Sequence, residues 1–594
     1  MKLRNYFFGA LACLALASCS SDDDAIDSGQ ETGGKYISVN IATSGTTRGT
    51  AGGYEAGITE PDENNITNII LVFYNGNNFL SADEATIKTS SEGSYDPNVE
   101  AIATATAYSV PSATNGEPNR IVAIINGGSL ITEGNLNMEK PNLEVLQKKI
   151  ADYGAKTSGK FVMSNSVWED NNGYTTVTSS NFFASTDLAE ASPVDIYVER
   201  VNAKVEMTFA SGFTTQSSIV YYQDGTNAEV YPIPVKFNLS CTADNSYLVK
   251  QLPSGTDWQN GWDWNSSDDK RSFWAKSSAT DNQFTHYKYT NDTGENIGVS
   301  VGTVTPATPP QAISGKTNHS LALTITETGK FYCLENTLQE KLTKALITTQ
   351  FHTWNSSTST LEPYYGDILN WHSTNYNSKS AYLEAVKTEI NNYINGATAL
   401  TLKLIRKDKY SDVTGAKQWE VVADIVETSA TLSLKSNSEN ISIDDLEKIL
   451  RGVSVDSKYD DVKDYLNSTA KFWGSGRAYY YVDIEHFGIE ASGTAYGVVR
   501  NHIYRLEFQS MKGLGSPVYD PDPEYDPTKP EDPDPTDPST PETEDDPKDP
   551  DGPEPDEEEP IIPDTPDETE KYLSAKINIL KWRIVNQSGI ELGK

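Results

Sequence analysis

The chain has 594 residues, a hydrophobic content of 37% and a formal net charge of −37 at pH 7. This length predicts two large domains or three ordinary ones, and the hydrophobic content is sufficient for real cores. The acidic balance argues against nucleic acid as a partner, because phosphate binding needs clustered Lys and Arg.

The first 18 residues have the layout of a secretory signal peptide. Two cationic residues precede an apolar run that is too short to cross a membrane as a helix. The run ends in LASC at 16–19, which resembles the lipobox of bacterial lipoproteins, where the cysteine becomes the acylated first residue. The acidic stretch 20–24 resembles the signals that send Bacteroidetes lipoproteins to the cell surface. We therefore expect a lipid on Cys19 as the membrane contact; the alternative is an ordinary signal peptide with an incidental cysteine.

Residues 35–41, KYISVNI, predict a first strand. Ile37, Val39 and Ile41 occupy every second position, which is typical of a strand with one apolar face. A stretch rich in Gly and Thr follows at 42–53 and contains one arginine, Arg48. Because proteases cut exposed loops of small residues, this strand is separable from the rest of the chain by a single cleavage.

The following elements predict a first domain at 49–211. The apolar, β-branched runs 66–74 and 120–126 favour buried strands, and helical spacing within 142–154 favours a helix capped by Asn142. The longest strand signal covers 194–209. We place the end of the first domain just after it, near Ser211.

A second domain is predicted at 212–516. It begins with the strand-rich segment 218–250, and leucines at spacing four in 334–346 predict a helix, as does the apolar stripe within 383–394. Ser442 and Asp445 resemble a capping box before a short helix. Strands return at 479–484 and 502–508. The pattern indicates a mainly β protein of two β-sandwich domains with short helices inserted on their connections.

Two features of this second domain leave alternatives open. Cys241 and Cys333 are the cysteines that remain after the leader, and they form either a disulfide or two buried thiols. Three tryptophans crowd the polar segment 258–264 and either stack on sugar rings or pack a loop against the sheet.

An acidic, proline-rich segment at 517–570 predicts an extended linker. Residues 520–570 hold 23 acidic residues, two lysines and 15 of the 29 prolines. Such a run repels itself and cannot bury apolar surface, so it acts as a stiff spacer; the prolines break the ligand spacing of an EF-hand.

A strand is predicted again at the end of the chain, within 571–594. Leu573, Ala575, Ile577 and Ile579 alternate with polar residues, the period-2 pattern of a half-buried strand. Because this strand follows a long tether, it can complete its own sheet or that of another subunit.

The motifs of several enzyme classes are absent from the sequence. The six histidines show no zincin spacing, and there is no P-loop, no GxSxG elbow and no GxGxxG after a strand. The sequence contains pairs of carboxylates, so a glycosidase remains an open alternative. We expect no enzymatic activity, no metal and no cofactor.

Three segments together resemble the Mfa-like family of Bacteroidetes fimbrillins, the building blocks of type V fimbriae. They are VERVNAKV at 198–205, YGVVRNHIY at 496–504 and INILKWRIVNQSGIEL at 577–592. The resemblance implies two transthyretin-like β-sandwiches and a lipoprotein precursor that reaches the surface. It also implies cleavage by an arginine-specific protease between Arg48 and Gly49, which removes the propeptide 19–48.

In such a family the groove left by the first strand accepts a terminal strand from the next subunit. Here the removable strand carries Ile37, Val39 and Ile41, and the donor carries Leu573, Ala575, Ile577, Ile579 and Trp582. The partners implied are other copies of the chain in a head-to-tail filament, the protease, and accessory tip and anchor fimbrillins.

The expected function is therefore a fimbrial shaft subunit that polymerises by protease-triggered strand exchange and supports adhesion. The rival from another class is a glycan-binding surface lipoprotein that uses the tryptophan cluster. A third alternative, a surface hydrolase, needs a cleft with convergent carboxylates.

Overall fold

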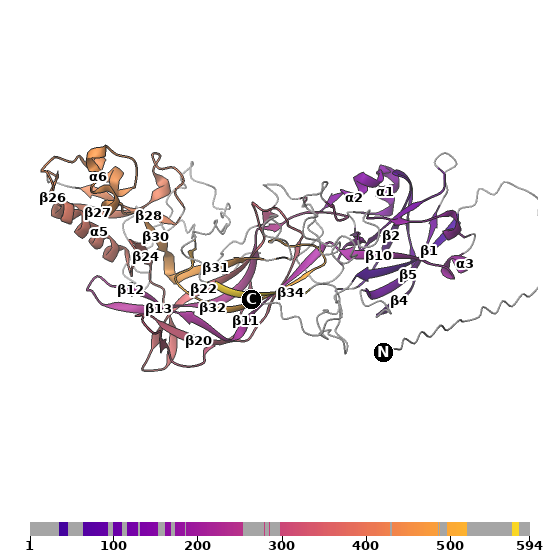
Figure 1. Ribbon diagram of the computed structural model, residues 1–594, viewed down its shortest axis with the longest axis horizontal. Coiled ribbons are helices and arrows are strands. Elements are labelled where there is room, and N and C mark those ends of the chain that lie inside the picture. Colours follow the sequence, from indigo (N-terminus) through magenta and orange to yellow (C-terminus); the bar gives the residue numbers. More distant parts are fainter. Residues whose placement is uncertain are drawn as a thin grey trace, which may run out of the picture.

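In the computed structural model, strands are the predominant regular structure of the described residues and helices are few and short, which confirms the mainly β class. Figure 1 shows an elongated molecule with β1 (Lys35–Ser44) at one end and α5 (Lys379–Tyr393) at the other. The structure describes residues 35–44, 63, 65–92, 99–109, 116–128, 131–151, 161–167, 173–183, 186–252, 278, 284–285, 298–417, 419–427, 431–484, 486, 496–518 and 573–580.

The first body is a nine-stranded sheet in the order β3-β2-β6-β8-β10-β1-β5-β4, with β9 paired to β6. Besides β1, its strands are β2 (Ile69–Asn75), β3 (Asn78–Glu84), β4 (Thr86–Glu92), β5 (Val99–Ser109), β6 (Arg120–Ile125), β8 (Met163–Asn165), β9 (Thr175–Thr176) and β10 (Val194–Arg200).

Both faces of β2 and β6 are buried, which explains their continuous apolar sequences. On one face, Ile70 and Val72 pack with residues of α1 (Glu133–Glu139) and α2 (Leu143–Gln147). On the other face, Leu71 and Phe73 share a core with β5 and β10. β5 also contacts β2 and β3 directly, so the sheet closes over its own core as a sandwich.

The second body is a sandwich of two sheets. The first sheet has the order β18-β20-β11-β32-β34, with β19 paired to β20 and β21 paired to β11. The strands of the second sheet that belong to this body have the order β12-β13-β22-β31-β33. Its main strands are β11 (Asn202–Gln216), β12 (Ser218–Tyr221), β13 (Asn227–Ser240), β18 (Val304–Pro306), β19 (Gln311–Ala312), β20 (His319–Ile325), β21 (Gly329–Leu334), β22 (Lys344–Asn355), β23 (Thr360–Pro363), β31 (Arg477–Asp483), β32 (Ile503–Met511), β33 (Ser516–Pro517) and β34 (Leu573–Leu580). Phe237, Ile347 and Phe508 lie in the core between the sheets.

The long strand signal at 194–209 is two strands in the structure. β10 ends at Arg200 in the first body, and β11 begins at Asn202 in the second, so the chain changes sheets at Val201. The expected domain boundary near Ser211 lies inside β11. An apolar run cannot reveal such a change of sheets, because both halves are buried strands.

A third unit, the inserted module, lies between β23 and β31. It comprises β24 (Ile368–Trp371), β25 (Thr374–Tyr376), α5, β27 (Thr401–Arg406), β28 (Glu420–Glu427), α6 (Ile443–Leu450), α7 (Lys463–Leu466) and β30 (Ala470–Trp473). Its strands extend the second sheet of the second body, with Tyr221 and Tyr376 in register.

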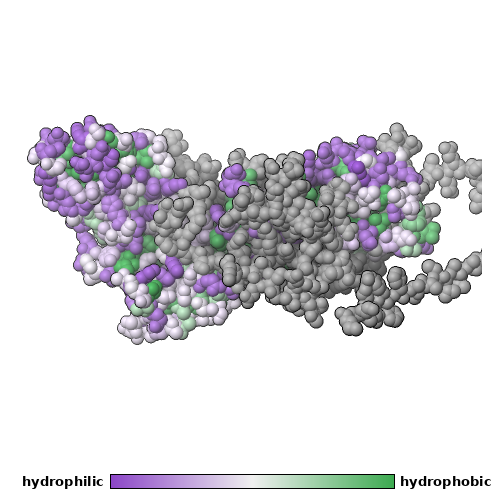
Figure 2. Space-filling model, viewed as in Figure 1, coloured by the Kyte–Doolittle hydropathy of each residue, from purple (hydrophilic) through white to green (hydrophobic). Residues whose placement is uncertain are grey.

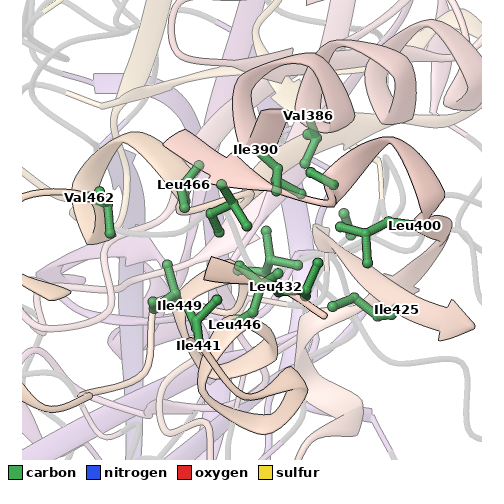
Figure 3. Packing of buried hydrophobic residues seen from close by; sticks show 14 of the residues in the cluster. Val386, Ile390, Leu400, Ile425, Leu432, Ile441, Leu446, Ile449, Val462 and Leu466 are labelled. Atoms are coloured by element: carbon green, nitrogen blue, oxygen red, sulfur yellow. The ribbon is translucent and has the colours of Figure 1, made fainter. Parts of the chain in front are cut away.

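The inserted module has a hydrophobic core of its own. Figure 3 shows Val386 and Ile390 of α5 above Leu446 and Ile449 of α6, with strand and loop residues between them. The face of the module seen in Figure 2 is mostly hydrophilic. Among the described helices, none has the length and apolar character needed to span a membrane.

The predicted helices have mixed outcomes. The stripe within 383–394 is helix α5, and Ser442 caps α6 by accepting from the backbone N–H of Asp445, as predicted. Asn142 likewise caps α2, but this helix ends at Gln147, and Ile150 lies in the short strand β7 (Ile150–Ala151). The helix predicted at 334–346 is wrong, because Leu334 ends β21 and Leu346 lies in β22. The leucines at spacing four coincide there with two strands and their connection.

The inserted module is fixed to the second body where its two ends meet. Gln350 of β22 donates from its side-chain amide to the carbonyl oxygens of Tyr364 and Gly476, at 2.6 and 3.1 Å. Gly476 has φ +65°, and a Cβ on it would clash with the carbonyl oxygen of Tyr364. This close approach requires glycine.

Replacing Gly476 with Ala should therefore destabilise the chain by about 3 kcal/mol or more, since backbone strain and a steric clash add. The matched control is Gly415→Ala, at φ +73° with open space around its Cβ. There we expect only the strain of a left-handed residue, about 1–2 kcal/mol. Urea unfolding checks this, and equal losses in the two variants would contradict the account.

Candidate functional site

β1 lies inside the sheet of the first body, between β10 and β5. It pairs in parallel with β10 over Val39–Thr43 and antiparallel with β5 over Lys35–Ser44. Among the described strands of this sheet, β1 is the one that joins β10 to β5. The first strand predicted from the sequence therefore lies in the interior of this sheet. In the sequence it precedes the predicted first domain, 49–211.

The position that β1 occupies, which we call the slot, has one apolar side. Ile41 is in register with Ile196 of β10 and Ala103 of β5, and Val39 is in register with Val194 and Ala105. Ala103, Ala105 and Ile196 are fully buried in the core of the first body. The slot therefore combines β-branched residues on β10 with small residues on β5.

A short helix, α3 (Thr186–Glu190), packs beside the slot and contacts both β1 and β5. Thr106 of β5 donates from its hydroxyl to Glu190 Oε1 at 3.3 Å. Thr106 is buried and Ala189 is fully buried, so α3 is closely packed in spite of its length. The side of the slot opposite the apolar core thus carries a carboxylate.

The C-terminal strand β34 pairs antiparallel with β32 of its own chain. Leu573, Ala575, Ile577 and Ile579 are in register with Met511, Phe508, Leu506 and Tyr504, which are buried. β34 is the last strand in this order, with β32 as its one neighbour among the described strands. In this structure the expected donor therefore lies at the edge of its own sheet.

The remaining expected site residues lie outside the described ranges. These are Cys19, Arg48, Gly49 and Trp582, together with the linker residues 519–570 and the tryptophans 258, 262 and 264. The cleavage position is bracketed by described residues, since β1 ends at Ser44 and Glu63 is again described.

Glu63 anchors the chain at the junction between the two bodies. Its Oε1 lies 2.8 Å from Lys204 Nζ and accepts from the Tyr332 hydroxyl at 2.5 Å. Its carbonyl oxygen accepts from Arg200 Nε at 2.8 Å. Glu63 and Lys204 are both about 3% exposed, so the pair is shielded from water. Glu63, which follows the expected cleavage position in the sequence, is thus tied to β10, β11 and β21.

A second buried ion pair lies within the second body. Arg500 is fully buried and donates to the carbonyl oxygens of Leu248 and Tyr247 at 3.1 and 2.7 Å, with Glu335 Oε1 3.5 Å away. Arg500 and Arg200 belong to the segments YGVVRNHIY and VERVNAKV. The charged residues of both segments are therefore buried structural groups.

Sequence reasoning missed several residues of this region. It did not single out Glu63, which no local pattern distinguishes. It also missed β5, although its alternating alanines at 101–107 are a period-2 signal. Glu190 could not be found, because its partner Thr106 is distant in the sequence.

The two cysteines left open by the sequence are free and buried. Burial raises the pKa of Cys241 to about 11 and that of Cys333 to about 12. Both thiols are therefore protonated and unreactive at neutral pH. Within the described ranges, no group of three or more His, Cys, Asp and Glu gathers into a metal site.

Residues 471–588 match the family model described as "Major fimbrial subunit protein type IV, Fimbrillin, C-terminal". This part of the chain is therefore similar to the C-terminal domain of fimbrillins. The match includes β31, β32 and β34 and confirms the resemblance over this region. Fimbrillins are structural subunits, so the match supports a non-enzymatic role. Among curated proteins there is no match.

Several solved structures are similar to the chain. A candidate cell adhesion protein from Parabacteroides distasonis is 14% identical, with a TM-score of 0.34, covering 83% of this chain and 94% of that one. A fimbrilin from Porphyromonas gingivalis is 13% identical (TM-score 0.29; 81% and 92% covered), and the tip fimbrial protein Mfa3 from the same species is 8% identical (TM-score 0.25; 80% and 95% covered).

Replacing Lys204 with Met should destabilise the folded chain by about 3–5 kcal/mol, because it leaves the Glu63 carboxylate buried without its cation. The matched control is Lys463→Met, which removes an exposed pair with Asp460 and should cost about 0–1 kcal/mol. Urea unfolding measures both free energies. A Lys204→Met variant as stable as the control would show that the junction does not depend on this pair.

Proposed function

We propose that the chain is a structural subunit of a cell-surface fimbria and that it polymerises by strand exchange. Cleavage between Arg48 and Gly49 frees β1, and the C-terminal strand of another copy fills the slot. The observation that carries this proposal is the position of β1, which is central in its sheet and yet ends at Ser44, four residues before the arginine. The fimbrillin match of 471–588 supports the same class of function.

Loss of β1 would leave a defect that another strand can repair. The backbone N–H and C=O groups of β10 and β5 that face β1 would lose their partners, and buried groups of this kind are costly when unpaired. An incoming strand restores these hydrogen bonds and brings its own apolar residues into the slot. Each aliphatic side chain buried in this way contributes about 1.5–3 kcal/mol.

The position of β34 supplies a reason for exchange to be favourable. In its own sheet β34 has β32 as its neighbour, whereas in the slot of another copy it would pair with both β10 and β5. It would therefore exchange one ladder of hydrogen bonds for two.

The acidic segment gives β34 the reach that exchange requires. Residues 521–570 carry a proline-rich sequence, and at ~3.1 Å per residue such a stretch of about 50 residues extends to roughly 150 Å. A strand on a tether of this length can reach a neighbouring subunit. Because a contact between the C-terminal strand of one copy and the slot of the next is head-to-tail and does not close, it generates a filament.

The precursor in this proposal is a lipoprotein acylated on Cys19, and removal of 19–48 releases the subunit from the lipid into the fimbria. Its partners are other copies of the chain, with an arginine-specific protease and accessory tip and anchor subunits. The fimbria itself supports adhesion.

Replacing Arg48 with Ala should trap the precursor as a monomer that retains β1, because the protease then lacks its arginine. Thr47→Ala is the control, since it changes the same loop and leaves the arginine in place. Residues 20–594 of each variant are treated with an arginine-specific protease, and the new N-terminus and the particle size are read. An Arg48→Ala chain that still loses β1 and assembles would contradict the proposal.

Removing the donor should leave a folded chain that does not polymerise. A chain ending at Glu570 lacks β34, and after cleavage it should stay monomeric while its slot still accepts a synthetic peptide of residues 573–594. The control is the full-length chain, which should form ladders that resist SDS. Filaments formed by the truncated chain alone would refute the donor role of β34.

A further inference from the structure

β1 and β34 share a sequence pattern that suggests how one replaces the other. β1 contains Val39-Asn40-Ile41, and β34 contains Ile577-Asn578-Ile579. When these triplets are superimposed, residues 37–42 correspond to 575–580. Apolar residues then meet apolar positions at 37, 39 and 41, and polar residues meet polar positions at 38 and 40.

The slot distinguishes this alignment from its reverse. Position 38 is in register with Thr106, whose hydroxyl donates to Glu190. The superposition places Lys576 at position 38, beside the Glu190 carboxylate. β1 has Ser38 there, so the donor would place a cation at a position where β1 has a neutral residue.

A donor that ran in the opposite direction about the same centre would be poorly matched. Leu580 would then take position 38, next to Thr106 and Glu190. Lys576 would take position 42, which is in register with Tyr197 of β10 and Ile102 of β5. The charged residue would leave Glu190, and an aliphatic residue would replace it.

We propose that the donor strand enters the slot in the direction of β1, in the register that sets residues 577–579 at the positions of residues 39–41. In that register Lys576 of one copy pairs with Glu190 of the next. This inference rests on the strand exchange proposed above, and it names Glu190 as a residue that selects the incoming strand.

Cysteine cross-linking tests the direction and the register. The chain 20–594 carrying Ala103→Cys and Ile579→Cys is cleaved, allowed to assemble and oxidised. A second variant carries Asn578→Cys with Thr104→Cys. Directly opposite pairs alternate between wide and close Cα separations in an antiparallel ladder, so the two variants together include a close pair. At least one of these two variants should form covalent ladders without reductant, with the linked peptides identified by mass spectrometry. Cys241 and Cys333 are buried and contribute little background.

The swapped variant, Ala103→Cys with Ile577→Cys, is the matched control. It should stay uncross-linked, since it joins its cysteines only if the donor is reversed or shifted by two residues. Cross-links in this variant, or polymers without cross-links in either of the first two, would overturn the inference. If the wild-type chain does not polymerise after cleavage, the proposed function itself fails, and this outcome is distinct from both.

A charge exchange tests the role of Glu190 without cysteines. Glu190→Lys should slow polymerisation, and adding Lys576→Glu should restore it. Asp187→Lys is the control, because it puts the same charge on an exposed residue of α3. Equal effects of Glu190→Lys and Asp187→Lys, or no rescue by the second change, would show that Glu190 does not select the strand.

Discussion

A strand in the interior of a sheet cannot be removed without leaving two rows of unpaired backbone groups, and this constraint governs the first body of the protein. β1 supplies the partners of β10 on one side and of β5 on the other. Because β5 also covers the core, the slot is part of the sandwich itself rather than a surface groove. The same sheet that makes β1 necessary makes a replacement strand necessary once β1 has gone.

The junction between the bodies explains how the rest of the chain can stay intact while its first strand is exchanged. Glu63 follows the expected cleavage position and is held by Lys204, Tyr332 and Arg200. Removing one partner of a buried ion pair of this kind strongly destabilises the fold. The intact pair nevertheless contributes little to stability when compared with a pair of apolar residues in its place. It therefore fixes the geometry around Glu63, which stays attached to both bodies.

Sequence periodicity predicted the elements whose apolar residues recur on a single face. The alternation at 37–41 and 573–579 corresponds to β1 and β34, and the stripe at 383–394 corresponds to α5. It failed at 334–346, where leucine spacing fits a helix but tertiary pairing favours strands. Nor did it reveal the change of sheets at Val201, since the strands on both sides are buried.

The site could be predicted only in part, for a physical reason. Patterns along the chain identify which strand is apolar, but the residues that line the slot come from β5, β10 and α3, which meet only in the fold. Glu190 and Glu63 are single carboxylates in an acidic chain, and nothing local marks them. The inserted module was also not predicted. The sequence pattern indicates short helices on the connections of a sandwich, but it does not show that these helices enclose a core of their own.

Backbone hydrogen exchange of β5 and β10 tests the central claim most directly. The amides that face β1 should be protected in the intact chain, exchange rapidly once cleavage and mild denaturant have removed β1, and regain protection when the cleaved chains assemble. The account predicts this loss and recovery on those two strands. Protection that persists after β1 has been removed would show that the slot does not open, and strand exchange as described here would be contradicted.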